Sequence, residues 1–428
     1  MDSHAGSAGD EWRRNGMLPL AAALGYATCV IHIYGLGVYI GPVAEEFGWS
    51  RAAVTVGLTL SMMIQALTAI PIGLAVDRFG PRKLALIGVV LTCAAFANIG
   101  NASGGQANWY MIWIVMSLAS LPVQATVWTS AVASRFTASR GLALAVTLCG
   151  ASVALIVFPW LGAKLIADYG WRQAMRIEAV IWLAVAWPLV FLLFRGAQDV
   201  KPKDVKPKDV APEERAVLRG ISMRQGLRST VFLRLMLVAL LFTFAMIGLN
   251  VHFPLILKAQ GYDPLAAAGL ASLIGFASIP GRIGTGLLLD RLRASRVGAA
   301  AFLLPAVACA VLLLGGGGTL SAVIAACFIG FTLGAEVDVL VFLTTRHFGL
   351  KNFGGLYGGV LAALSVGTAF GPLAAARVFD VEGRYDLFLW LTIALMLVSS
   401  AALLSLPKPE DAPEDAPEDA LPQAPPQL

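Results

Sequence analysis

Charged residues are scarce in this chain of 428 residues: Asp, Glu, Lys and Arg make up 13%, whereas hydrophobic residues make up 58%. A water-soluble globular protein usually carries about 25% charged residues. The scarcity therefore excludes an ordinary soluble domain as the main part of the chain, and the mean hydropathy of +0.76 agrees. We expect lipid to surround most of the chain.

Cysteines are also few, and their arrangement excludes two kinds of site. All five lie in apolar stretches, their number is odd and no CxxC spacing occurs, so neither a disulfide framework nor a metal site is predicted. No phosphate-binding loop in its required context and no nucleophile constellation is present. We therefore expect no enzyme, no cofactor and no metal. The net charge of +5 does not indicate nucleic acid, because the basic residues fall in short loops between apolar runs.

Twelve apolar runs are each long enough to cross a bilayer, which takes about 20 residues. A backbone in lipid must satisfy its own hydrogen bonds, and the period-two alternation of barrel strands is missing, so the runs predict helices. The expected fold class is an all-α membrane protein with twelve transmembrane helices. The runs are 17–40, 52–76, 83–101, 109–134, 140–167, 171–194, 230–257, 264–289, 296–315, 319–345, 352–377 and 385–406.

The loops between these runs alternate between basic loops and loops poor in net positive charge, and "NASGGQAN" and "GGGGT" carry no charge at all. The positive-inside rule places the basic set in the cytoplasm, together with both termini. We expect a multi-pass protein of the cell membrane, and of the inner membrane in a bacterium. The first run is longer than the apolar core of a signal peptide, so it predicts a membrane helix.

The chain divides into five segments. Pro and charge in "KPKDVKPKDV" cannot build a core, so that part predicts a linker, with a short surface helix around 213–228. The repeated "PEDA" at the end predicts a disordered acidic tail. The segments are a cytoplasmic N-terminus (1–16), a six-helix bundle (17–194), a cytoplasmic linker (195–229), a second six-helix bundle (230–406) and the tail (407–428).

The two bundles repeat each other at one fixed shift of 213 residues. The matches run from the second helix to the last, and six helices per half give both halves the same orientation. A parallel repeat about an axis along the membrane normal is predicted. The matched positions are Gly48 with Gly261, Asp77-Arg78 with Asp290-Arg291, Gly141 with Gly354, Pro159 with Pro372, and Gly170 with Gly383.

Two of the repeated loops resemble the signature loops of the major facilitator superfamily: "GLAVDRFGPRK" and its counterpart "GTGLLLDRLRASR". The resemblance implies two rocking halves and secondary transport without an ATPase. It also implies a gating role for Asp77, Arg78, Asp290 and Arg291, whose charges would pair across the halves and part as they rock. The plainer interpretation is topology charge at helix ends.

Three further stretches resemble the group of monocarboxylate transporters and oxalate–formate antiporters: "GVYIGPVAEEFGWSRAAVT", "SRFTASRGLALAV" and "GFASIPGRIGTG". In that group an arginine in the third stretch binds the substrate carboxylate, which here implies Arg282. Two departures matter. Ser278 stands where the mammalian carriers place a proton-coupling Asp, and 352–377 lacks the lysine of the oxalate carriers, so a clamp for a dianion is not expected.

Arg282 is a permanent charge in an apolar run, and inserting it costs about 2.5–3.5 kcal/mol or more. It must therefore face water, a carboxylate or a substrate anion, and its planar fork suits a carboxylate. The rival role is an ion pair with Glu336 or Asp338 at similar depth; two positions apart, only one of these can face it. A substrate could displace that acid, which would then take a proton.

Weaker candidates lie in the helices expected to line a central cavity. Each has a plainer interpretation as a packing residue or a contact between helices. Besides Ser278, they are His32 and Tyr34, Gln124 and Trp128, Asn250, and Tyr357; His252 is a still weaker one. Arg172, Arg176 and Glu178 are expected to satisfy one another or Lys164 and Asp168.

The sequence thus predicts a secondary transporter of an organic monocarboxylate, by proton-coupled uptake, that works as a monomer in the bilayer. Its partners would be a small organic anion and protons. One alternative is efflux or exchange of a larger amphiphile, since the fold does not encode direction. The other, from a different class, is a receptor or scaffold that binds a ligand without moving it.

Overall fold

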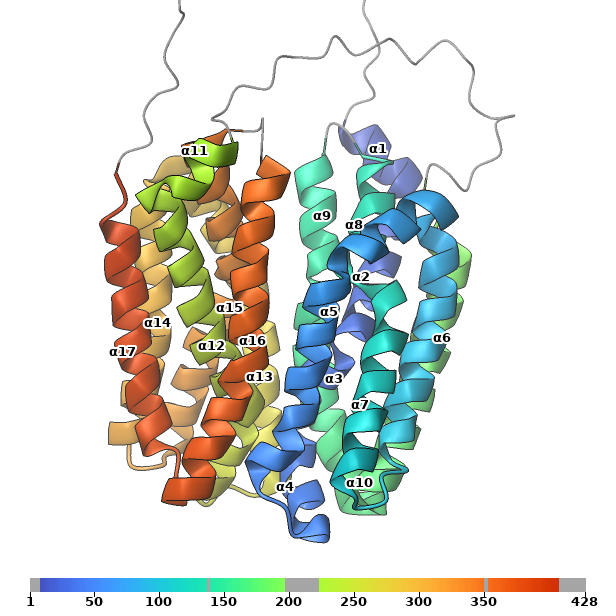
Figure 1. Cartoon of the computed structure of the whole chain (residues 1–428), viewed down its shortest axis with the longest axis vertical. Coiled ribbons are helices and arrows are strands. Elements are labelled where there is room, and N and C mark those ends of the chain that lie inside the picture. Colours follow the sequence, from blue (N-terminus) through green and yellow to red (C-terminus); the bar gives the residue numbers. More distant parts are fainter. Residues whose placement is uncertain (1–7, 137–138, 197–222, 350–352, 408–428) are drawn as a thin grey trace, which may run out of the picture.

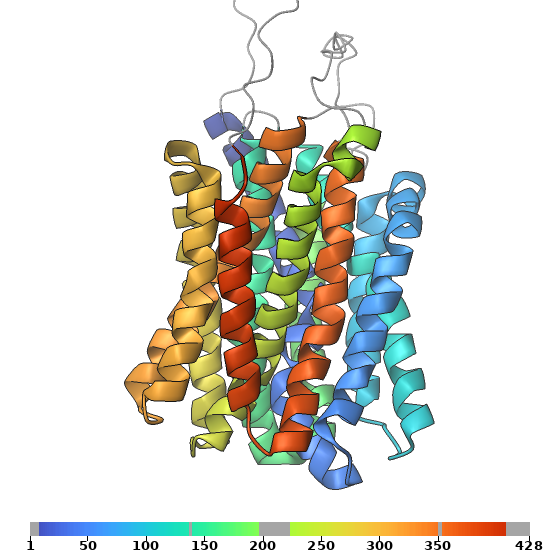
Figure 2. The ribbon, with the colours of Figure 1, turned by 60° about the vertical axis from the view of Figure 1, so that its left-hand side comes forward.

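The computed structural model describes residues 8–136, 139–196, 223–349 and 353–407, and helices dominate these ranges. Two helical bundles stand side by side, one built from α1–α10 and the other from α11–α17 (Figure 1). Figures 1 and 2 both show helices running nearly parallel between two sides. We call the side that holds α1 and the end of α17 the terminal side, and the opposite side, where α4 ends and α5 begins, the far side.

The first bundle contains α1 (Ala8–Asn15), α2 (Met17–Cys29), α3 (Ile31–Tyr34), α4 (Leu36–Phe47), α5 (Arg51–Phe79), α6 (Pro81–Ile99), α7 (Gln106–Ser120), α8 (Ala125–Ala133), α9 (Arg140–Leu148) and α10 (Gly150–Leu193). The second contains α11 (Met223–Arg228), α12 (Thr230–Ala259), α13 (Pro264–Arg291), α14 (Ala294–Leu314), α15 (Thr319–Phe348), α16 (Phe353–Glu382) and α17 (Asp386–Leu404).

The twelve expected crossings are present, although within the described ranges ten helical stretches are individually long and apolar enough to span a membrane. The first crossing is divided among α2, α3 and α4. One continuous helical stretch holds two crossings, because Gly170 at φ +73° reverses the chain within α10. The crossings predicted over 17–40, 109–134 and 140–167 are present, but each is locally interrupted. In the second case Pro122 lies in a 3-10 turn and has no N–H to continue the helix.

The shift of 213 residues recurs in the structure itself. α5 and α13 begin at Arg51 and Pro264, and α6 and α14 begin at Pro81 and Ala294. Matched glycines also share left-handed backbone, with φ +65° and +95° at Gly48 and Gly261. Only glycine adopts such angles without strain. The two bundles are therefore structural repeats.

Parts of the predicted segments fall outside the described residues, namely 1–7, 197–222 and 408–428. Within the first segment, α1 packs on the bundle: Trp12 lies 5.3 Å from Phe136 between ring centroids. The Glu11 carboxylate accepts hydrogen bonds from the backbone N–H and the hydroxyl of Ser139. Of the surface helix expected around 213–228, α11 is the described part.

The halves meet along two seams, α5 with α16 and α10 with α13. Toward the far side they are in contact, since the Thr59 hydroxyl donates to the Ala369 carbonyl at 2.7 Å. Toward the terminal side the same face of α16 becomes exposed at Ala362 and Gly358. A side chain added at Gly358 would meet nothing within 4 Å. The halves are therefore joined at the far side and parted at the terminal side.

Candidate functional site

Arg282 lies on α13 and is buried. Its Nη1 lies 3.5 Å from Oδ1 of Asp338 on α15. Neither Nη1 nor Nε has a hydrogen-bond partner within the described chain. A buried charged donor normally makes hydrogen bonds, because leaving it unsatisfied costs roughly 1–3 kcal/mol or more. The guanidinium is thus paired, but only loosely.

Close packing of α13 on α15 creates this pair. A side chain at Gly281 would overlap the carbonyl of Phe331, and one at Gly334 would overlap the carbonyl of Ser278 and the backbone nitrogen of Arg282. Asp338 follows Gly334 by one turn and so lies on nearly the same face of α15. The glycines therefore let the two backbones approach until the carboxylate reaches the guanidinium.

The two acids of α15 point in different directions, as their spacing predicts. Asp338 pairs with Arg282, whereas Glu336 is buried and takes part in no ion pair within the described residues. Glu336 lies within electrostatic range of Arg282 and of Tyr26 and Tyr34 from the first half. The site is therefore assembled from both halves.

Three tyrosines lie within electrostatic range of Glu336. Tyr34 and Tyr357 were candidates from the sequence, and Tyr357 lies within electrostatic range of both Glu336 and Asp338. Tyr26 was missed, although it lies in the same apolar run as Tyr34, and that is the signal that could have identified it. Cys149, on the first half, is also within range of Arg282 and Asp338.

Ser278 contributes to the seam between the halves. Its hydroxyl lies 2.7 Å from both the Ser152 hydroxyl on α10 and the Gly275 carbonyl. It therefore holds α13 against the first half, one turn from Arg282.

His32 belongs to a separate polar cluster inside the first half. Its Nε2 lies 3.3 Å from the Ser61 hydroxyl and 3.2 Å from the Gln65 amide nitrogen, which in turn donates to Ser120. Its ring is fully buried against the edge of Trp113. The structure does not bring His32 together with Arg282.

The candidates Gln124 and Trp128, at the start of α8 and within it, have structural contacts. Trp128 is fully buried, donates from Nε1 to the Val123 carbonyl at 2.7 Å and packs on Phe194. Gln124 precedes α8 in extended backbone, where the helix is interrupted. Trp128 therefore fills the core of the first half and does not bound the space beside Arg282. Asn250 is buried on α12.

The candidate gating residues lie at the terminal side. Arg78 and Arg291 are exposed, and the Arg78 guanidinium lies 5.4 Å from the ring of its neighbour Phe79. The side chains of Asp77 and Asp290 are outside the described part of the structure. The gating roles stay predictions.

The far-side charges pair differently from the sequence-based expectation. Arg172 pairs with Glu46 at 2.7 Å, Arg176 bonds to Asn101, and the Tyr39 hydroxyl donates to Glu178 at 2.6 Å. The hydrogen bond from Arg172 lowers the pKa of Glu46 from its usual value. After Gly170 the second part of α10 starts beside the end of α4 and the loop after α6, so Arg172 and Arg176 find partners that are distant in sequence.

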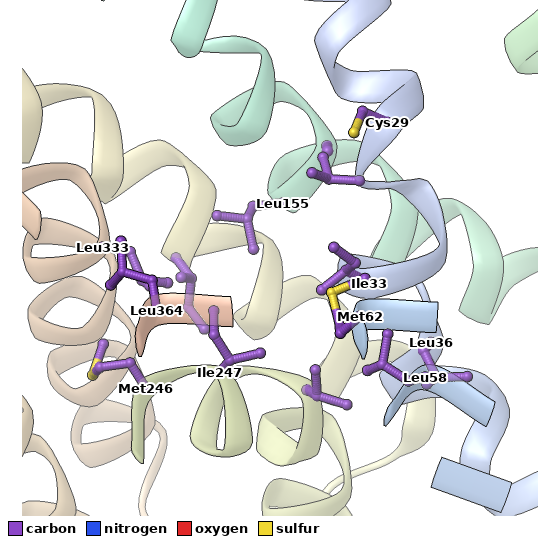
Figure 3. Packing of buried hydrophobic residues seen from close by; sticks show 14 of the residues in the cluster. Cys29, Ile33, Leu36, Leu58, Met62, Leu155, Met246, Ile247, Leu333 and Leu364 are labelled. Atoms are coloured by element: carbon purple, nitrogen blue, oxygen red, sulfur yellow. The ribbon is translucent and has the colours of Figure 1, made fainter. Parts of the chain in front are cut away.

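Apolar side chains of both halves also lie toward one another. Figure 3 shows Ile33 and Met62 of the first half and Ile247 and Leu364 of the second, all facing a common centre. Among the described residues, no three His, Cys, Asp or Glu side chains gather as a metal site would require. The chemistry of the centre is one loosely paired cation, two acids, tyrosines and apolar walls.

Comparison with known proteins places these features among transporters. A sequence model of the Major Facilitator Superfamily matches residues 22–352. Monocarboxylate transporter 13 of Bos taurus is 24% identical over 390 residues, 87% of this chain and 84% of that protein. The chloramphenicol resistance protein of Streptomyces lividans is 27% identical over 339 residues, 76% and 81%. MFS transporter asaE of Aspergillus flavus is 24% identical over 319 residues, 73% and 68%. Since these names cover different compounds, the choice of substrate has to come from the site.

Proposed function

This chain belongs to the Major Facilitator Superfamily, and we propose that it carries an organic monocarboxylate, together with a proton, into the cell by alternating access. The terminal side, where Arg78 and Arg291 lie, would face the cytoplasm by the positive-inside rule. The similarity to a monocarboxylate transporter supports this choice of substrate class.

One observation carries the proposal: the Arg282 guanidinium is buried, its Nε and Nη1 lack hydrogen bonds, and its one ion pair is 3.5 Å long. A substrate carboxylate could accept two parallel hydrogen bonds from this fork. It would satisfy donors that the protein itself leaves open. A structural ion pair would instead be expected to close its hydrogen bonds, because half-satisfied charges in a membrane are costly.

Proton coupling follows from displacement of the Asp338 carboxylate. When a substrate carboxylate occupies the guanidinium, Asp338 loses its positive partner inside an apolar protein, where an isolated carboxylate is strongly disfavoured. Taking up a proton neutralises it. Glu336 is the second acid of the same helix and is already without an ion pair among the described residues. Anion and proton would thus enter the site together.

The first half supplies the other wall of the site. Tyr26 and Tyr34, both within range of Arg282, carry hydroxyl groups that can donate to a carboxylate oxygen. A substrate held by Arg282 on one half and by a tyrosine on the other would draw the halves together. Binding and rocking of the halves would then be linked.

A thermal-shift screen of the purified protein against about fifty organic acids tests the anion site, because a ligand that binds the native state raises its apparent stability. We expect one or more acids to stabilise the parent but not Arg282→Gln. The matched control is Arg172→Gln, an arginine paired at the far side, which should respond as the parent does. Equal stabilisation of parent and Arg282→Gln, or a preference for neutral or cationic ligands, would overturn the proposal.

Uptake into proteoliposomes with an imposed pH gradient tests the coupling and separates transport from mere binding. We expect an acid found in the screen, added outside the vesicles, to accumulate inside them when the interior is more alkaline than the outside. Without the pH gradient it should enter only slowly. A bound ligand that never enters the vesicles would favour a receptor or scaffold.

The apolar centre shown in Figure 3 also suits the second candidate, a carrier that expels or exchanges a larger amphiphile. The similarity to a chloramphenicol resistance protein points the same way. This candidate predicts that bulky aromatic ligands stabilise the protein more than small acids do, and that Arg282→Gln leaves that stabilisation intact.

A further inference from the structure

The start of α5 at the far side is capped by a residue of the other half. Asp380 of α16 accepts hydrogen bonds from the backbone nitrogens of Arg51 and Ala52, both at 2.8 Å. The α5 N-cap Ser50 accepts only from Ala53. The first N–H groups of a helix have no partner within the helix, and a carboxylate is favoured there by the helix dipole. The N-terminus of α5 is therefore capped jointly, by Ser50 of its own half and by Asp380 of the second half.

The side chain of Arg51 makes a further set of contacts across the same boundary. Its Nη1 donates to the Tyr385 hydroxyl at 2.7 Å, and its guanidinium carbon lies 3.5 Å from the centre of the Phe379 ring. An arginine over an aromatic ring is stabilised by the attraction of its positive charge to the negative face of the ring. One residue of the first half thus engages a ring, a hydroxyl and, through its backbone, a carboxylate.

His252 holds the receiving hydroxyl in place. Its Nε2 lies 3.0 Å from the Pro372 carbonyl, which can only accept, so Nε2 carries the proton. Its Nδ1, 2.8 Å from the Tyr385 oxygen, therefore accepts from that hydroxyl. The lone pairs of the Tyr385 oxygen are then directed to Arg51. His252 of α12 therefore acts as a positioning residue at the far side.

Among the described residues, an ion pair also joins the halves at this side and is weaker; the hydrogen bond from the Thr59 hydroxyl to the Ala369 carbonyl is a neutral one. Lys258 lies 3.7 Å from Glu45, and both side chains are largely exposed. Exposed pairs of this kind contribute little. By contrast, Arg51 and Asp380 are partly buried and hydrogen-bonded from several directions. The strength of the closed far side is concentrated in one group of residues.

We propose that Arg51, Phe379, Asp380 and Tyr385 form a far-side clasp that must part before the central site can open to the far side. Parting would leave the α5 N-terminus without its carboxylate and Arg51 without its hydroxyl and ring. Water would replace these partners only in part. The clasp thus biases the molecule toward the form open at the terminal side, whatever the substrate.

Distance measurement between spin labels by double electron–electron resonance tests the clasp. Labels go on Gln106→Cys of α7 and Ala266→Cys of α13, two exposed far-side positions on opposite halves, in protein whose Cys149 and Cys327 are replaced by Ser. We expect Asp380→Asn and Arg51→Gln each to raise the longer-distance population about tenfold, the size expected for losing a charge-assisted hydrogen bond. No ligand is needed, so the result stands apart from the anion proposal.

The control is Arg172→Gln, which breaks the pair with Glu46 at the same side but within one half. It should leave the distances unchanged. Alkylation of Cys149, which is partly exposed near Arg282, gives a second readout that needs no engineered label. Its rate should fall in the clasp variants as the terminal side closes. Unchanged distances and Cys149 rates in both clasp variants, or equal changes in Arg172→Gln, would overturn the proposal.

Discussion

Arg282 owes its proposed role to the shape of its charge as well as to the sign. Lysine would preserve the positive charge but has no planar pair of donors to match a carboxylate. We therefore expect Arg282→Lys to weaken binding of the stabilising acid by about tenfold or more. Isothermal titration of parent and variant measures this. Equal affinity would mean that the site senses charge alone.

Asp338 and Glu336 should behave differently when neutralised, since only Asp338 is paired with Arg282. Asp338→Asn removes the group that competes with a substrate, so the apparent melting temperature without ligand should fall and the ligand-induced rise should grow. Glu336→Gln is the matched change on the same helix and should leave the rise nearly as in the parent. Thermal-shift titration checks both. A larger ligand-induced rise for Glu336→Gln than for Asp338→Asn would mean that the substrate displaces Glu336 and not Asp338.

Glu46 gives a pH dependence whose direction can be worked out. Its pKa is lowered in the folded protein, first by the hydrogen bond from Arg172. This contribution to stability is present above the carboxyl's unfolded pKa and is lost as pH falls through the folded pKa. Between neutral and acid pH, the melting temperature of Glu46→Gln should fall less than that of the parent. Parallel curves would show that the pair contributes nothing.

At this scale the sequence predicted the chemistry better than the contacts. The cost of a membrane arginine identified Arg282, and helix geometry predicted that only one acid would face it. Which acid it would be depended on the contact of Gly334 with α13, a tertiary fact. The contact of Trp128 is likewise a tertiary fact that local sequence does not encode: its indole N–H donates to the Val123 carbonyl, in the 3-10 turn before α8.

The α13–α15 contact makes a prediction about helices as packed elements. A methyl group at Gly334 would overlap backbone atoms of Ser278 and Arg282. Overpacking of this kind costs typically about 1–3 kcal/mol. Gly334→Ala should therefore lower stability and weaken acid binding together, in thermal unfolding and titration.

The control lies on the same pair of helices. A methyl group at Gly286 would meet nothing within 4 Å, so Gly286→Ala should leave stability unchanged or slightly raised through helix propensity. If both variants behave alike, the close approach does not position the site.

Element ends were predicted less well than element cores. Hydropathy located each crossing because lipid demands a long apolar run. The first crossing is interrupted at Val30, where neither a proline nor a glycine indicates a break in the helix. The interruption arises where the first crossing packs against several helices at once, and local sequence does not encode that.

The two halves are in contact at the far side and apart at the terminal side, which predicts the reactivity of the native cysteines. Cys149 is partly exposed near the site, while Cys29, Cys93 and Cys309 are buried. Cys327 borders an apolar groove with Phe276 and Phe331, where a water-soluble reagent is excluded by lipid. A membrane-impermeant maleimide should therefore modify Cys149 alone.

Mass spectrometry of right-side-out and inverted vesicles locates the modification. We expect labelling in inverted vesicles and protection by a bound acid. Labelling from the outside instead would reverse the proposed orientation.

For the molecule as a whole, the count of apolar runs and the shift of 213 residues were enough to predict two parallel six-helix halves. Neither reports how the halves touch. That depends on pairs such as Arg51 with Asp380, separated by more than three hundred residues, whose meeting no local pattern requires.

The capping of α5 by Asp380 makes the two seams chemically unequal, although the repeat makes them geometrically equivalent. At the shift of 213, Arg51 corresponds to Pro264 and Asp380 to Ala167. Asp263 caps α13 from within its own half. Symmetry is therefore broken by a handful of side chains. A tandem duplicate of the second half would carry Pro264 in the place of Arg51, so it would lack the clasp, and the clasp would no longer choose the side on which the molecule rests closed.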